Sequence, residues 1–281
     1  TQADLLLVKF TSSLEFDGSA TYSGEGIDSL YNNSANDIQQ TADGGYVVVG
    51  NTFNGSDYDV LIVKFSSQLT LMWQDTIQGT YNDYGNSIQE TEDGGFVVCG
   101  TSYDGNDEDI MLWKINVAID GVTSTPSYTV LYNAESSVDN NTRDFGNYAQ
   151  QTTDGGYIIV GTSATGIQIT KLAQDGTADA TFGTAGILTV GSAGDEGTFI
   201  QQTKSGSYIV VGNTDGGAGQ QSDVFLNTIS SAGVSVLTRT MGGAYDDKAT
   251  SLIQTSDGGF VFTGFQHKKV QWGTTAIYGS K

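Results

Sequence analysis

The sequence predicts an all-β protein, a β-propeller of about five four-stranded blades, and three observations lead to this fold class. A phrase of ten residues recurs five times, as TADGGYVVVG, TEDGGFVVCG, TTDGGYIIVG, TKSGSYIVVG and TSDGGFVFTG. Its third residue stands at positions 43, 93, 154, 205 and 257, so the steps are 50, 61, 51 and 52 residues. No helical periodicity accompanies this period, and a period near 50 is typical of propeller blades.

Each repeat unit divides into four expected strands. A short polar–apolar alternation, such as NSIQET (86–91), suits a half-buried first strand. The Asp-Gly pair after it predicts a tight hairpin of type I′. The nearly continuous apolar strand that follows, such as YVVVG (46–50), predicts burial on both faces. A third strand such as DVLIVKF (59–65) and a more polar outer strand such as LTLMWQDTI (69–77) complete the unit.

The order of the phrases also predicts how the ring closes. The chain opens on DLLLVKF (4–10), a third-strand phrase, and its fifth DGG strand, 260–264, comes close to the end. We therefore expect N-terminal strands to complete the last blade, which removes open sheet edges. The alternative is six blades, one of them partial, with the tail 265–281 supplying a third strand of its own. We expect one domain, 1–281, with repeat units of about 33–82, 83–143, 144–194, 195–246, and 247–281 joined by 1–32.

Two sets of phrases carry a family resemblance. KLAQDGTADATFGTAGILTV (171–190) followed by GSYIVVGNT (206–214) resembles the delta-sixty class of bacterial β-propeller repeats. The other four units resemble a DGG-repeat pattern of secreted Bacteroidetes proteins, with phrases such as SIQQTxDGGYVVxG and DxLLVK. The resemblance implies secretion, and adhesion or assembly more often than catalysis.

Composition limits the classes of partner. The formal net charge is −21, from 11 basic and 32 acidic residues. Such a charge repels phosphate backbones, so we expect no nucleic-acid partner, and no apolar run is long enough for membrane insertion. Cys99 is the only cysteine and stands where other copies carry small apolar residues, so we expect a buried side chain and no internal disulfide.

Two series of acidic residues follow the repeat, and their recurrence favours structural roles. The first series belongs to the DGG phrase: Asp43, Asp93, Asp154 and Asp257. The second stands ten residues earlier: Asn33, Asp83, Asp144, Asp195 and Asp247. For the second series we expect side chains that accept backbone N–H groups at the entry to each first strand. The alternative is a ring of carboxylates that holds cations at a channel mouth.

One loop is a candidate calcium site. Asp104, Asp107 and Asp109 offer closely spaced oxygen ligands, which suit calcium, although the loop lacks the spacing of an EF-hand. No other cofactor is expected. The longest repeat step contains an insertion within 116–145, and we consider Tyr128, Tyr132 and Arg143 a possible binding lip there.

Catalysis has little support in the sequence. His267 is the single histidine, and no nucleophile–base set can be assembled. A glycosidase needs only two carboxylates, but no unrepeated acidic pair stands out. We therefore predict no catalytic residues and no enzyme, but a secreted or cell-surface propeller that binds a protein partner or a surface glycan and can form part of a larger bacterial surface complex. The alternatives are a carbohydrate-active enzyme with carboxylates at the channel mouth and a calcium-stabilised lectin.

Overall fold

The computed structural model describes residues 4–23, 32–117, 126–134, 144–216 and 221–266. These residues form twenty β-strands in six antiparallel sheets, with no helix among them and therefore no helical membrane span. The strands of the two-stranded sheets are β1 (Leu5–Phe10), β2 (Phe16–Tyr22), β19 (Asp247–Gln254) and β20 (Phe260–Gln266).

Four sheets have four strands each, and we number them as blades 1 to 4. Blade 1 contains β3 (Asn33–Gln40), β4 (Tyr46–Phe53), β5 (Tyr58–Phe65) and β6 (Leu71–Ile77). Blade 2 contains β7 (Asp83–Glu90), β8 (Phe96–Tyr103), β9 (Glu108–Asn116) and β10 (Ser127–Asn133). Blade 3 contains β11 (Phe145–Gln151), β12 (Tyr157–Ser163), β13 (Gly166–Leu172) and β14 (Ile187–Val190). Blade 4 contains β15 (Glu196–Gln202), β16 (Tyr208–Asn213), β17 (Val224–Ile229) and β18 (Ser235–Met241).

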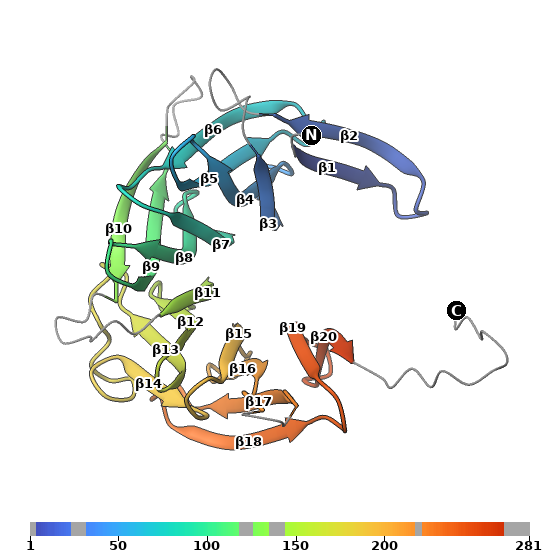
Figure 1. Cartoon of the computed structure of the whole chain (residues 1–281). Coiled ribbons are helices and arrows are strands. Elements are labelled where there is room, and N and C mark those ends of the chain that lie inside the picture. The colour runs from blue at the N-terminus through green and yellow to red at the C-terminus, as the bar shows by residue number, and fades with distance from the viewer. Residues whose placement is uncertain (1–3, 24–31, 118–125, 135–143, 217–220, 267–281) are drawn as a thin grey trace, which may run out of the picture.

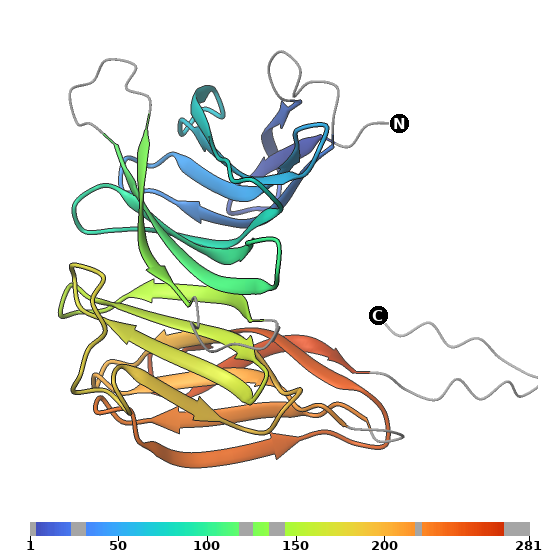
Figure 2. The ribbon, with the colours of Figure 1, turned by 60° about the vertical axis from the view of Figure 1, so that its left-hand side comes forward.

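The blades stand side by side around a central space, which confirms the β-propeller of about five blades (Figures 1 and 2). In each complete blade the strands pair in chain order, and Figure 1 shows the first strand of each blade nearest the centre. The sheets β1–β2 and β19–β20, which we call the N- and C-terminal half-blades, lie at the two ends of this arc. Together they hold the strands of a fifth blade, but no backbone pairing joins them among the described residues.

The DGG strands form the centre of the hydrophobic core, as the apolar runs predict. Val47, Val48 and Val49 are all buried, since β4 packs on one face against blade 2 and on the other against the N-terminal half-blade. Cys99 and Trp113 are buried as well, and Trp113 packs between blades 1 and 2. Burial raises the pKa of the Cys99 thiol, so it is inert at neutral pH. Blades hold together through their flat apolar faces.

The DGG turn differs from the predicted type I′ hairpin. Gly44 has φ +79° and donates its N–H to the carbonyl of Thr41, while Thr41 donates to Gly45. Asp43 is not among the residues with positive φ, so the loop is a type I turn closed by a left-handed glycine. The carboxylate of Asp43 accepts the Gly45 N–H at 2.8 Å, which explains why aspartate precedes the two glycines.

A buried lysine on the third strand binds the aspartate of the DGG turn in each of the first three blades. The pairs are Lys64–Asp43 at 2.9 Å, Lys114–Asp93 at 2.9 Å and Lys171–Asp154 at 3.0 Å. Blade 4 has lost both partners, with Ser205 in the turn and Thr228 on the strand. The adjacent Asn227 is buried, and its amide donates to Ser235 and Thr238. Asp43, Asp93 and Asp154 therefore each join a turn to the third strand of the same blade.

Polar side chains of the first strands tie neighbouring blades together. Gln39, Gln89, Gln150 and Gln201 each accept a backbone N–H from the first strand of the next blade. Asn36, Asn86 and Asn147 each donate to a backbone carbonyl of the next blade, at 2.7–2.8 Å. These repeated contacts fix the spacing of the first strands around the centre. The first strands therefore also hold, at defined positions, the side chains that differ from blade to blade.

Candidate functional site

Two positions of the first strand break the repeat, and both belong to the strands that surround the centre. The first, which we call the rim position, directly follows the residue of the Asn33/Asp83 series. Its occupants are Ser34, Tyr84, Phe145, Glu196 and Lys248. The second, which we call the inner position, lies three residues further along. Its occupants are Asp37, Ser87, Tyr148, Phe199 and Ser251. Five different residue types at the rim position indicate that it is not needed for blade packing.

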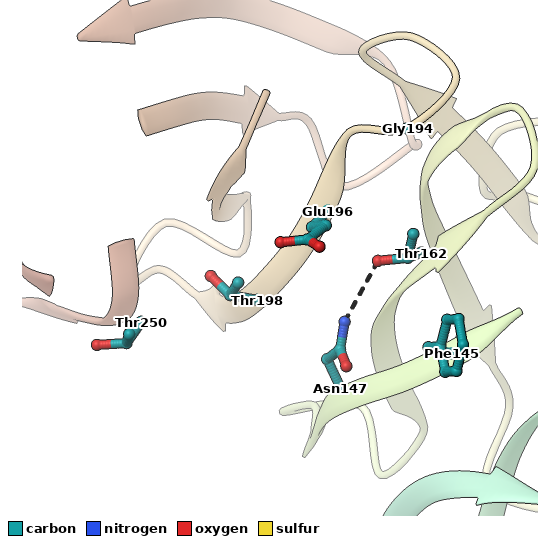
Figure 3. A pocket seen from close by; sticks show the side chains of 7 residues that line it. All are labelled: Phe145, Asn147, Thr162, Gly194, Glu196, Thr198 and Thr250. Carbon is teal, nitrogen blue, oxygen red and sulfur yellow. Dashed lines mark hydrogen bonds between the residues drawn. The ribbon is translucent and has the colours of Figure 1, made fainter. Parts of the chain in front are cut away.

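A pocket of about 440 Å³ opens at the rim of blades 3 and 4 and of the C-terminal half-blade. Its lining residues are Phe145, Asn147, Thr162, Gly194, Glu196, Thr198 and Thr250. Figure 3 shows Phe145 and Asn147 on β11 and Glu196 and Thr198 on β15 around the same space. The pocket therefore combines one exposed aromatic ring, one carboxylate, an amide and three hydroxyl groups.

Glu196 supplies the carboxylate of this pocket. Its side chain is 49% exposed, and its Oε2 lies 3.2 Å from Nζ of Lys248, the rim residue of the next first strand. Phe145 is 36% exposed on the neighbouring strand. A carboxylate held by a lysine beside an open aromatic face is a common arrangement for binding a sugar, which has both hydroxyl groups and an apolar face.

Asp37 is a second unrepeated carboxylate, at the inner position of blade 1. Its Oδ1 accepts the Ile38 N–H at 2.8 Å and its Oδ2 accepts the Ile88 N–H at 2.9 Å. Burial is the largest influence on this carboxyl and raises its pKa, while the two N–H groups act in the opposite direction. Ser87 accepts the Ala149 N–H in the equivalent place of blade 2, so a hydroxyl suffices for the structural contact. The negative charge of Asp37 is thus not required for the contact that this position makes in the other blade.

Aromatic residues occupy the inner positions of blades 3 and 4. The rings of Tyr148 and Phe199 lie with their centroids 4.0 Å apart. Burial, and secondarily the charge of Asp37, raises the pKa of Tyr148 to about 12. The phenol stays protonated and is available as a hydrogen-bond donor.

The opposite ends of the first strands, at the DGG turns, carry another set of carboxylates. A pocket of about 410 Å³ there is lined by residues that include Glu90 and Glu92. Glu90 accepts the Ala42 N–H at 2.7 Å, in the place where blades 3 and 4 use Gln151 and Gln202 for the same kind of contact. The same contact recurs in successive blades at the DGG-turn end of the first strands, so the contact of the Glu90 carboxylate is explained by the packing of one blade against the next.

The second acidic series shows the predicted backbone contacts at one position. Asp195 accepts the N–H groups of Ser192 at 2.8 Å and Asp215 at 2.7 Å. Asp83 is also buried, but it faces the carboxylates of Asp59 and Asp57. Burial is the main cause that raises the Asp83 pKa to about 6, and the two like charges add to it. Junctions between blades therefore differ in how they accommodate the same aspartate.

We expect Asp83→Asn to stabilise the metal-free protein at pH 7 by about 1–3 kcal/mol. A carboxyl with a raised folded-state pKa contributes stability that is complete below its unfolded value of 3.8 and is lost as pH rises through about 6. Urea unfolding in EDTA between pH 4 and pH 7 measures this difference. Asp195→Asn is the control, and a pH-independent effect of Asp83→Asn would contradict the explanation.

The three candidate calcium ligands do come together. Carboxylate oxygens of Asp104, Asp107 and Asp109 lie within 4.8 Å of one another, and Asp107 and Asp109 are buried. Asp104 accepts the N–H groups of Asn106 and Asp107 at 2.7 and 3.1 Å, so it also closes its own loop. Calcium binding at this loop stays a prediction.

The residues proposed as a binding lip are placed apart from the pocket. Tyr128 and Tyr132 lie on β10, the outer strand of blade 2. Tyr132 is half-buried and packs against the core between blades 2 and 3, and burial raises its pKa. Arg143 and His267, together with the tail from 267 onward, lie outside the described residues.

Comparison with known proteins identifies the fold. No family model and no curated protein matches the sequence. The structure is similar to an α-L-arabinanase of Penicillium chrysogenum complexed with arabinobiose, with a TM-score of 0.59 and 10% identity over 93% of this chain and 79% of that one. It is also similar to an α-L-arabinofuranosidase of Fusarium graminearum in complex with an iminosugar inhibitor, with a TM-score of 0.53 and 9% identity over 95% of this chain and 93% of that one. At these identities the likeness establishes a shared β-propeller fold.

These findings correct two predictions from the sequence. The leading interpretation, a non-catalytic binding module, is wrong, and so is the prediction that the chain is not an enzyme, because the similar solved structures include an α-L-arabinanase and an α-L-arabinofuranosidase. They favour the carbohydrate-active alternative. Two carboxylates, Asp37 and Glu196, each occur once among five equivalent positions. Aligning the five first strands residue by residue would have revealed both.

Proposed function

We propose that this protein is a carbohydrate-active enzyme, a glycoside hydrolase whose site is the pocket at the rim of blades 3 and 4. The observation that carries the proposal is the pocket in which Glu196, a carboxylate that occurs once among five equivalent positions, lies beside the exposed ring of Phe145. We propose Asp37, the unrepeated carboxylate at the inner position of blade 1, as the second carboxyl group. Hydrolysis of a glycosidic bond requires two carboxyl groups with different protonation states.

The surroundings of the two carboxyl groups support different roles. Burial raises the pKa of Asp37, which favours a proton-carrying general acid. Glu196 is exposed and its Oε2 lies 3.2 Å from the Lys248 ammonium, so its carboxylate is open to the substrate and to water and would act as a nucleophile or as a base toward water. Phe145 would stack on the apolar face of a sugar ring. Thr198 and Thr250 would bind hydroxyl groups of the substrate.

For the substrate we propose an arabinose-containing oligosaccharide. The support is the shared fold with two enzymes that act on α-L-arabinosyl linkages, one of them solved with arabinobiose. The pocket volume of about 440 Å³ is adequate for a short oligosaccharide. We also propose that the protein acts outside the cell, because its net charge of −21 and its resemblance to repeats of secreted proteins suit that location.

The proposal is tested with the full chain and a panel of glycans. Purified protein is incubated with arabino-oligosaccharides, arabinan, xylan and β-glucan between pH 4 and pH 8, and released sugars are separated by anion-exchange chromatography. We expect products from arabinose-containing substrates. Release from another glycan alone would replace the proposed substrate class, and no release from any of them would contradict hydrolysis.

A further inference from the structure

A pair of aspartates recurs where one blade meets the next. One aspartate begins the third strand of a blade, and the other precedes or begins the first strand of the following blade. The three pairs are Asp59 with Asp83, Asp109 with Asp144, and Asp223 with Asp247. In blade 3, Gly166 takes the place of the first partner. There the remaining carboxylate, Asp195, accepts two backbone N–H groups, so a single aspartate at a junction is satisfied by the chain itself.

The pair between blade 4 and the C-terminal half-blade is not satisfied in this way. Asp247 is 5% exposed, and neither of its carboxylate oxygens has a hydrogen-bond partner. Oδ1 of Asp223 is also buried without a partner. The neighbouring cation, Lys248, binds Glu196 of β15. Asp223 and Asp247 therefore have, in total, three buried carboxylate oxygens that accept no hydrogen bond.

Both carboxylates lie against the same turn. A Cβ added to Gly242 would stand 1.7 Å from Oδ1 of Asp223, and a Cβ added to Gly243 would stand 3.7 Å from Oδ2 of Asp247. Asp247 and Gly242 also line one cavity of about 330 Å³. The backbone holds the arrangement in place, since Asp247 donates its N–H to the Ser222 carbonyl at 2.8 Å. The Gly242–Gly243 turn thus leaves room for both acidic groups.

We propose that Asp223 and Asp247 bind a calcium ion at this junction. Buried carboxylates without donors are strongly unfavourable, and two of them carry the charge that one divalent cation neutralises. Calcium accepts six to eight oxygen ligands in flexible geometry, so backbone carbonyls of the turn and water can complete its shell. The ion would fasten the last described first strand to blade 4. This site is separate from the proposed catalytic pocket and does not depend on hydrolysis.

Calorimetric titration of the full chain with calcium chloride, after treatment with EDTA, tests the proposal. We expect Asp223→Asn and Asp247→Asn each to bind one calcium ion fewer than the wild type. Asp195→Asn is the matched control, because its carboxylate already has two backbone donors. An unchanged number of calcium ions in both variants, or no calcium binding by the wild type, would overturn the site.

Thermal unfolding gives a second readout whose sign is specific. Without calcium, Asp247→Asn should unfold at a higher temperature than the wild type, because it removes an uncompensated buried charge. With calcium at about a hundred times its dissociation constant, the wild type should gain on the order of 5 °C and the variant should not. A variant that is less stable than the wild type in EDTA, or that gains as much from calcium, would refute the assignment. Far-UV circular dichroism confirms that each variant is folded.

Discussion

Asp93→Ser should lower the free energy of unfolding by about 2–3 kcal/mol, because it leaves the Lys114 ammonium inside the protein without its carboxylate. The side chain of Lys114 is 9% exposed and its Nζ lies 2.9 Å from Asp93. The pKa of Asp93 is lowered to about 2 against burial, by hydrogen bonds from Thr91, Lys114 and Gly95 and by the charge of Lys114. Urea unfolding at pH 7 measures the loss.

The double variant Asp93→Ser, Lys114→Met should recover most of this stability, since an apolar side chain can replace a buried ion pair at little cost. Blade 4 has lost both members of the pair, since Ser205 stands in the turn and Thr228 at the position of the lysine. Asp175→Ser is the control, because Asp175 is exposed and bonds only within its own turn. Equal stability of the single and double variants would contradict the role of the pair.

The same pair predicts a dependence on pH. An aspartate whose folded-state pKa is depressed contributes stability that is present above the unfolded value of 3.8 and is lost as pH falls toward about 2. The difference in stability between the wild type and Asp93→Ser should therefore shrink over that window.

Glu196→Gln should reduce kcat on the cleaved oligosaccharide by about 10²- to 10⁴-fold, the range for loss of a group that exchanges protons or attacks the substrate. The amide keeps the size of the side chain and its place in the pocket, so substrate binding should change little. Initial rates over a range of substrate concentrations separate kcat from KM.

Asp37→Asn should also lower kcat, and it should remove the fall of kcat/KM at high pH that follows from deprotonation of a general acid. Glu92→Gln is the matched control, because Glu92 lies at the opposite end of the first strands. If Glu92→Gln lowers the rate as much as Glu196→Gln, the catalytic site is not at the rim of blades 3 and 4.

The repeated part of the fold could be predicted from the sequence because the same physical requirement recurs five times. Buried strands such as 46–50 are apolar throughout, and every DGG turn needs a left-handed glycine. The turn type was not predictable from Asp-Gly alone, since Thr41 and Asp43 form side-chain contacts that favour a longer loop. The partner of Asp43 was equally hidden, because Lys64 lies on another strand and becomes its neighbour only through sheet pairing.

The candidate site was harder to predict for the opposite reason. Asp37 and Glu196 are single occurrences within strands that otherwise repeat, so a search for recurring motifs passes over them. Tyr132 was misleading, since an aromatic residue in the longest repeat unit suggests an exposed loop. It lies instead on the outer strand of blade 2 and packs against the core between blades 2 and 3. In a repeat fold, residues that differ between equivalent positions carry more information about function than residues that recur.

A crystal structure of the Glu196→Gln variant soaked with an arabino-oligosaccharide would show whether the pocket of Phe145 and Glu196 binds the substrate. We predict a sugar ring against Phe145, with a glycosidic oxygen beside residue 196 and hydroxyl groups at Thr198 and Thr250. A sugar bound only at the opposite end, near Glu90 and Glu92, or a pocket that stays without sugar while the wild type cleaves the same compound, would contradict the account.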